Sequence, residues 1–238
     1  ALARRVVHHL DRWNIAADDS AGRPLSQTPA GRLLLLLAEV MADKAPPVPL
    51  MALLAHPLVD GGMERGVWLR QLRRVERELR GPRRAGGLKP IGEIAGRLAE
   101  RHARSGEWFA LVERALDPLL ALSDRPHVSL AELLDMLAAT GEALCGEKLW
   151  AKEDGRAVAA FVEDFRLHAR EADFTLAPGD AAIALRDAME QVAVRPPYGG
   201  HARVQILGLL ESRMNRAELV ICAGLNEGVW PARGGVDA

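Results

Sequence analysis

The chain has 238 residues, of which 49% are hydrophobic, and its formal net charge is −1. This size and composition are typical of one large or two small globular domains, and the near-neutral charge means that any basic surface must be local. The two cysteines, Cys145 and Cys222, exclude a disulfide framework and a four-cysteine metal or iron–sulfur site within the chain. They fit a reducing cytoplasm.

The longest apolar run, residues 33–38, is too short to span a membrane, so we expect a cytoplasmic protein without a membrane partner. The sequence starts without methionine and ends in Gly-Gly-Val-Asp-Ala, so we expect a piece of a longer protein. An amphipathic helix is expected over residues 2–13, followed by a short strand at 15–18. Thr28 and Pro29 then predict the N-cap and the first turn of an apolar helix.

Helical periodicity dominates the middle of the chain. Ser129 and Glu132 have the spacing of a capping box, which marks the start of one of these helices. The helices that we expect after the proline-rich linker at 44–49 lie at residues 50–59, 64–81, 91–103, 107–122, 130–144, 155–172 and 180–192.

Two short apolar runs near the C-terminal end predict buried strands, at 204–208 and 218–224. The short connection between them leaves parallel, antiparallel and non-adjacent placement open. The simplest architecture has both ends of the chain in one α/β domain, made of residues 1–45 and 196–238. Residues 46–195 then form a helical insertion.

The stretch around the two apolar runs resembles the fifth conserved motif of UvrD-like superfamily 1 helicases. Its second half keeps the motif residues, which are Val220, Ile221, Gly224, Glu227, Gly228 and Pro231. Its first half has lost them, because Gly208 stands where the motif has Thr, Leu210 where it has His, and Arg216 where it has Glu. Arg213 alone preserves a charge, at the Lys position, and is therefore a candidate DNA contact. The resemblance therefore implies the scaffold of a motor domain without its motor chemistry.

This degenerate form resembles the AddB-type subunits of AddAB helicase–nucleases, in their alphaproteobacterial form. The resemblance rests on residues 208–233, with further similar stretches at 2–34 and 53–59. It implies a RecA-like (P-loop NTPase-like) second helicase domain with a large helical insertion. It also implies a role in processing DNA double-strand breaks for recombinational repair, with DNA and an AddA-type helicase–nuclease subunit as partners. The family's ATP and Mg²⁺ chemistry and its iron–sulfur cluster are expected outside this chain.

One predicted helix has two contrasting faces. Trp68, Leu72, Val75 and Leu79 fall on one arc, and the opposite arc holds Arg70, Arg73, Arg74, Arg77 and Arg80, with Arg83 and Arg84 just beyond. Rows of guanidinium groups suit phosphates, since each can hold two oxygens. The alternative is a solvated surface that Glu76 and Glu78 partly neutralise.

Other candidate residues favour structural roles. His8 and His9 are adjacent and point apart on a helix, and Asp18 and Asp19 are expected to make turn hydrogen bonds in a loop. Ser20 and Ser212 lack a nucleophile-elbow context, His56 precedes a proline at a helix end, and Trp230 either packs or stacks a base.

The sequence contains no Walker-type phosphate loop and no catalytic constellation. We therefore expect no cofactor in this chain, and neither ATP hydrolysis nor DNA cleavage by the chain alone. Two other classes of function stay open: a purely structural or protein-interaction helical module without DNA contact, and a small-molecule enzyme with a nucleotide site at the strand ends.

Overall fold

The computed structural model describes residues 2–19, 22–80, 86–195, 203–208, 212–213, 216–223 and 226. Within these residues the fold is mixed α/β and mostly helical. The chain divides into two compact units. One unit combines Ala1–Ala21 with Gly200–Ala238, and the other is the helical unit Gly22–Gly199.

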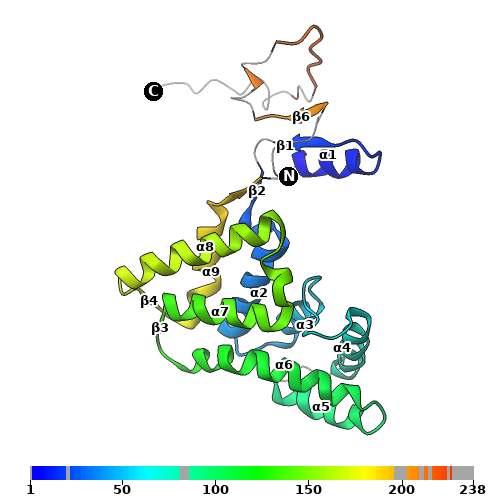
Figure 1. Cartoon of the computed structure of the whole chain (residues 1–238), viewed down its shortest axis with the longest axis vertical. Coiled ribbons are helices and arrows are strands. Elements are labelled where there is room, and N and C mark those ends of the chain that lie inside the picture. Colours follow the sequence, from blue (N-terminus) through cyan, green and yellow to red (C-terminus); the bar gives the residue numbers. More distant parts are fainter. Residues whose placement is uncertain are drawn as a thin grey trace. The chain divides into compact units, whose positions relative to one another are not determined.

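The unit that combines the two ends is built on a parallel strand pair. It contains α1 (Leu2–Asp11), β1 (Ala17–Asp19) and β6 (Val204–Ile206), and Ala17 is in register with Val204 (Figure 1). Two of the three predicted strands therefore lie side by side. The helix over residues 2–13 is also confirmed, apart from its last residues.

The third predicted strand, at 218–224, is not found among the described residues 216–223. Leu219, Val220 and Ile221 are 76%, 72% and 81% exposed. An apolar run becomes a buried strand only when neighbouring strands satisfy its backbone and other layers cover its side chains. The described residues of this unit supply neither, and they show no RecA-like sheet.

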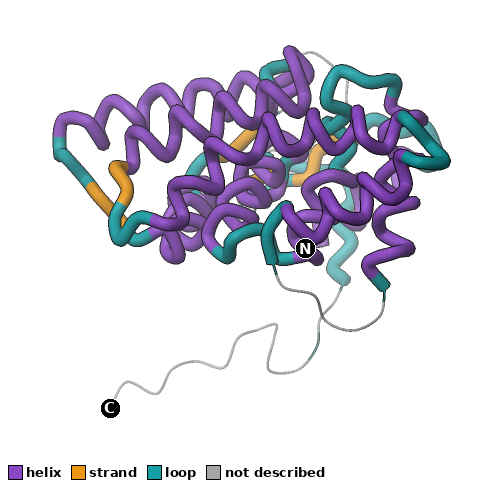
Figure 2. Tube along the Cα trace, turned by 90° about the horizontal axis from the view of Figure 1, so that it is seen from below, coloured by secondary structure: helices purple, strands orange, loops and turns teal. Residues whose placement is uncertain are grey.

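The helical unit confirms the prediction that the middle of the chain is predominantly helical. Its α-helices are α2 (Pro29–Ala42), α3 (Pro47–Ala55), α4 (Arg65–Leu79), α5 (Lys89–Ala99), α6 (Arg104–Leu120), α7 (Leu130–Cys145), α8 (Lys152–Glu171) and α9 (Ala181–Glu190). Its 3-10 helices are η1 (Leu25–Gln27), η2 (Ala121–Asp124), η3 (Gly146–Leu149) and η4 (Pro178–Asp180). Figure 2 shows how little strand accompanies these helices.

Two short antiparallel strand pairs join loops of this unit. One consists of β2 (Arg23–Pro24) and β5 (Ala193–Val194), and the other of β3 (Val128–Ser129) and β4 (Thr175–Leu176). The β2–β5 pair brings the beginning and the end of the helical unit together. None of the helices in the described part of the chain is both long and apolar enough to cross a membrane.

Helix α2 is the centre of the helical unit. Leu33, Leu34, Leu35 and Leu37 are at most 1% exposed, although they point in different directions around the helix. A helix that is apolar all round must be covered on every side, and α2 packs against α3, α7, α8 and α9. Residues 22–45, which the sequence placed with the α/β part, therefore belong to the helical unit.

The helix starts of α2 and α7 are formed differently. Thr28 caps α2 as predicted, because its Oγ1 accepts the N–H of Gly31 at 3.2 Å and Pro29 follows at the first helical position. Ser129 is also an N-cap, but its side chain makes no cap hydrogen bond. Glu132 instead accepts two hydrogen bonds from Arg125, at 2.8 and 2.9 Å. The predicted capping box is wrong, because Arg125 binds the Glu132 carboxylate that the box requires.

Candidate nucleic-acid interface on α4

The inner face of α4 is locked into the core of the helical unit. Trp68 and Val75 are fully buried and Leu72 nearly so, while Leu79 packs at the edge. The indole Nε1 of Trp68 donates to the carbonyl oxygen of Leu54 at 2.8 Å, and its ring packs against Trp108 with centroids 5.6 Å apart. The predicted apolar arc is confirmed, and the tryptophan hydrogen bond fixes the rotation of the helix about its axis.

A buried amide ties α4 to α6. The Oε1 of Gln71 accepts a hydrogen bond from Ser105 Oγ at 2.9 Å and another from Arg74 Nη1 at 2.9 Å. Gln71 and Ser105 are both buried, so these bonds form in an environment where an unpaired polar group is costly. The same oxygen therefore holds α4 against α6 and orients one of the arginines.

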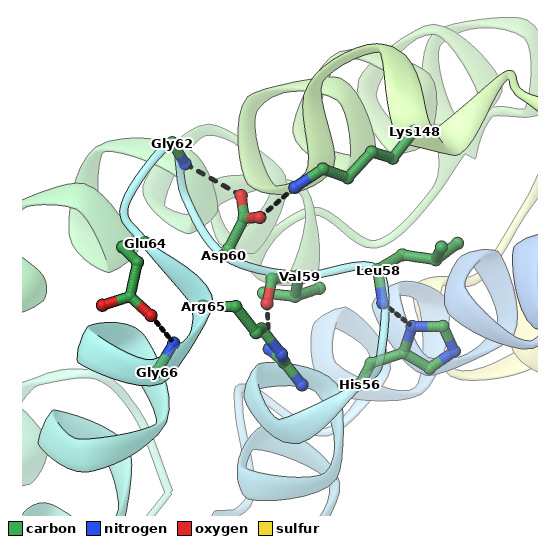
Figure 3. A network of polar contacts seen from close by, with 9 residues as sticks. All are labelled: His56, Leu58, Val59, Asp60, Gly62, Glu64, Arg65, Gly66 and Lys148. Carbon is green, nitrogen blue, oxygen red and sulfur yellow. Dashed lines mark hydrogen bonds and ion pairs between the residues drawn. The ribbon is translucent and has the colours of Figure 1, made fainter.

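The loop between α3 and α4 anchors the beginning of α4 (Figure 3). Arg65 donates from Nη2 to the carbonyl oxygen of Ala55 at 2.8 Å, and from Nη1 to that of Val59. Glu64 is the N-cap of α4, and its carboxylate accepts the N–H of Gly66 at 2.8 Å. The end of α3 and the beginning of α4 are thus joined by side-chain bonds to backbone groups.

The same loop is bound to the end of α7. The backbone N–H groups of Asp60 and Gly61 donate to the carbonyl oxygen of Leu144 at 3.1 and 2.9 Å. The buried carboxylate of Asp60 accepts the N–H of Gly62 at 3.1 Å and pairs with Lys148 in η3 (Figure 3). Both carboxylate oxygens of Asp60 therefore have partners within the fold.

Burial controls the titratable groups around this loop. It lowers the pKa of His56 to about 4, with help from the positive charges of Arg65 and Arg32. It also raises the pKa of the Cys145 thiol to about 12, and the nearby Asp60 carboxylate acts in the same direction. The neutral imidazole of His56 accepts the N–H of Leu58, and the thiol of Cys145 stays protonated, so both side chains support the fold as core groups.

The outer face of α4 is a concentrated positive surface. An open depression of about 480 Å³ is lined by Arg70, Arg73, Arg74, Glu76, Arg77 and Arg80, and we call this set the arginine face. Five arginines against two glutamates give α4 a net charge of +3, within a chain of net charge −1. The structure therefore brings together the five α4-face arginines that the sequence predicted.

Acidic partners neutralise only part of the arginine face. Arg70 lies 3.7 Å from Glu64, and Arg80 lies 3.2 Å from Glu76. Arg73 and Arg77, four residues apart and exposed, make no ion pair with any described residue. Like charges at this spacing repel each other, so an anion between or above them is favourable.

The residues of the degenerate helicase motif lie in the other unit. Gly208, Arg213 and Arg216 are exposed, and the N–H of Ser212 donates to the carbonyl oxygen of Gly208 at 2.9 Å. Leu210 and Glu227 lie outside the described residues, as do Arg83, Arg84 and Trp230. Arg213 belongs to the other unit and does not line the depression on α4.

The paired aspartates at 18 and 19 differ from the prediction. They are part of β1, in register with Gln205 and Ile206, and not of a loop, because the parallel partner strand satisfies their backbone groups. No three His, Cys, Asp or Glu side chains among the described residues come together as a metal site.

Two features that position the arginine face were not predicted from the sequence. Gln71 stands at the edge of an otherwise apolar arc, and an uncharged polar residue there was a signal for a buried hydrogen bond. Asp60-Gly61-Gly62 is a turn sequence, but its partners Leu144 and Lys148 are distant in the chain and carry no local signal.

Comparison with protein-family models, curated proteins and solved structures gave no match to this chain.

Proposed function

We propose that the chain is a non-motor, helicase-like part of a DNA-processing complex. More particularly, it is a portion of the B subunit of an AddAB-type helicase–nuclease, which acts in the cytoplasm on DNA double-strand breaks for recombinational repair. Its role in that complex is to hold DNA and to support assembly with an AddA-type subunit. The observation that carries the DNA-holding role is the arginine face on a firmly anchored helix.

The α/β unit supports the same proposal by its connectivity. Strands from opposite ends of the chain pair in parallel, as expected for a second RecA-like domain interrupted by a helical insertion. Val220, Ile221, Gly228 and Pro231 resemble the second half of the helicase motif, whereas Gly208 lacks the hydroxyl that the motors use. ATP and Mg²⁺ binding and the iron–sulfur cluster of the family belong to other parts of the complex in this proposal.

The direct test is DNA binding by the 238-residue chain across a salt series. Each phosphate neutralised releases condensed counterions, so the affinity should fall steeply with salt, by a log–log slope of about −0.9 per contact on duplex DNA. Absence of DNA binding at low salt would leave a structural or protein-interaction module as the function. Calorimetric titration with ATP tests the nucleotide-enzyme alternative, and a saturable heat of binding would contradict our proposal.

A further inference from the structure

We infer that the arginine face is a site for the phosphate backbone of double-stranded DNA, and that Arg73 and Arg77 are its principal contacts. This inference rests on the proposed function and adds the class of DNA and the anchoring pair. Among the described residues, Arg70 and Arg80 form ion pairs and Arg74 donates to Gln71, whereas Arg73 and Arg77 form neither kind of contact, so binding to these two breaks no existing contact. Arg70 and Arg80 must first leave Glu64 and Glu76.

The chemistry of the face argues against a single strand. Proteins that hold single-stranded DNA stack its bases on aromatic side chains, which supply much of the affinity. Trp68 is the one aromatic residue of α4, and it is fully buried with its indole N–H bonded to Leu54. Among the described residues, the arginine face therefore offers no aromatic ring on which an unpaired base could stack.

The arginine face has few side chains that can recognise base edges. Asn and Gln are the side chains that pair with adenine edges, and Gln71 is buried with its oxygen already accepting two hydrogen bonds. Arginine can contact guanine, but its guanidinium group binds phosphate oxygens equally well, and the carboxylate of Glu76 is already paired with Arg80. Contacts to the backbone are therefore favoured, and they carry no sequence information.

The geometry of α4 suits a stiff polyanion. From Arg70 to Arg77 the helix rises by about 10 Å, at about 1.5 Å per residue. A duplex presents roughly six phosphate charges over that distance, at one per about 1.7 Å. Because Trp68, Gln71 and Arg65 fix α4 to its neighbours, the helix backbone that carries the arginines is already in place before DNA binds.

The test compares a duplex with one of its own strands at equal length, by fluorescence anisotropy over a salt series. The proteins are the wild-type chain, Arg73→Ala/Arg77→Ala, and the control Arg97→Ala/Arg101→Ala, which removes two exposed arginines at the same spacing outside the face. Wild type should bind the duplex more tightly than the strand. The wild-type chain should bind duplex more tightly than Arg73→Ala/Arg77→Ala. The ratio of their affinities should fall about tenfold over a fourfold rise in salt, because the variant has lost two phosphate contacts.

The variant Arg73→Lys/Arg77→Lys keeps both charges and should keep the salt slope, and duplexes of different sequence should bind equally. Tighter binding to the single strand, or an equal loss in the Arg97/Arg101 control, would overturn the inference while leaving DNA binding by the chain intact. Failure to bind either form of DNA would overturn the proposed function as well. Thermal unfolding followed by circular dichroism should be unchanged in all variants, because the replaced side chains are exposed.

Discussion

Gly61 lies directly against the indole ring of Trp68: a Cβ placed on residue 61 would come within 2.5 Å of Cζ3 of that ring. The loop before α4 therefore passes so close to the helix that only glycine fits. Gly61 also has a φ of +58°, which is unfavourable for residues with a side chain. This contact fixes the distance between the loop and α4, the helix that carries the arginine face.

Gly61→Ala should destabilise the protein by about 2–4 kcal/mol, because it adds an overpacked Cβ to a strained backbone. Gly62→Ala is the matched control, since Gly62 has a φ of +80° but open space around its Cα. In Gly62→Ala the free energy of unfolding should fall only by the cost of a left-handed backbone conformation, about 1–2 kcal/mol. Denaturant unfolding measures both free energies, and equal losses would mean that the Trp68 ring moves aside at no cost.

Thr28→Ala should lower the free energy of unfolding by about 1 kcal/mol, because Thr28 Oγ1 accepts the N–H of Gly31 and donates to the carbonyl oxygen of Leu25. Ser129→Ala should change it little, because the Ser129 side chain makes no cap hydrogen bond. Urea unfolding of the two variants gives the comparison. A loss at Ser129 as large as that at Thr28 would restore the capping box that the sequence suggested.

Gln71→Leu should cost about 1–3 kcal/mol, since it leaves the buried hydroxyl of Ser105 without its acceptor. Adding Ser105→Ala removes that unpaired hydroxyl, so the double variant should recover part of the loss. A double-mutant cycle of unfolding free energies measures the coupling. Strictly additive losses would show that the two side chains do not depend on each other.

His56 makes the stability depend on pH. Its folded pKa of about 4 lies below the ordinary value of 6.5. Between these values His56 is protonated in the unfolded chain and neutral in the folded chain. The stabilisation that neutral, buried His56 gives is therefore fully present above pH 6.5. It is lost as the pH falls towards 4, which lowers the free energy of unfolding by up to about 3 kcal/mol.

His56→Gln should flatten the fall in unfolding free energy between pH 6.5 and pH 4. His127→Gln replaces an exposed histidine and should leave the profile of the wild-type protein unchanged. Unfolding in denaturant at a series of pH values measures the three profiles. An equally steep profile in His56→Gln would assign the pH dependence to other groups.

The sequence predicted what depends on local periodicity. The burial of Trp68, Leu72 and Val75 and the outward arginines follow from 3.6 residues per turn, and the start of α2 follows from Thr28 and Pro29. These features need no knowledge of distant parts of the chain. Their energetic origin lies within one or two turns of helix.

Features that depend on distant partners could not be read in this way. Asp60 is held by Leu144 and Lys148, and Glu132 is drawn away from its cap position by Arg125. The apolar run at 219–221 has the composition of a buried strand, yet strand formation depends on neighbours that composition does not specify. The position of residues 22–45 was decided by the helices around α2.

The parallel pairing of β1 with β6 has a kinetic consequence. Residues 17–19 meet residues 204–206 only when nearly the whole chain between them has been brought to a short end-to-end distance. Closing so long a loop in an unfolded chain is entropically unfavourable, and contacts of this separation slow folding. The β2–β5 pair brings residues 23–24 beside 193–194, so a helical unit that folds first closes most of that loop in advance. We therefore expect the β1–β6 pair to form only after the helical unit has folded.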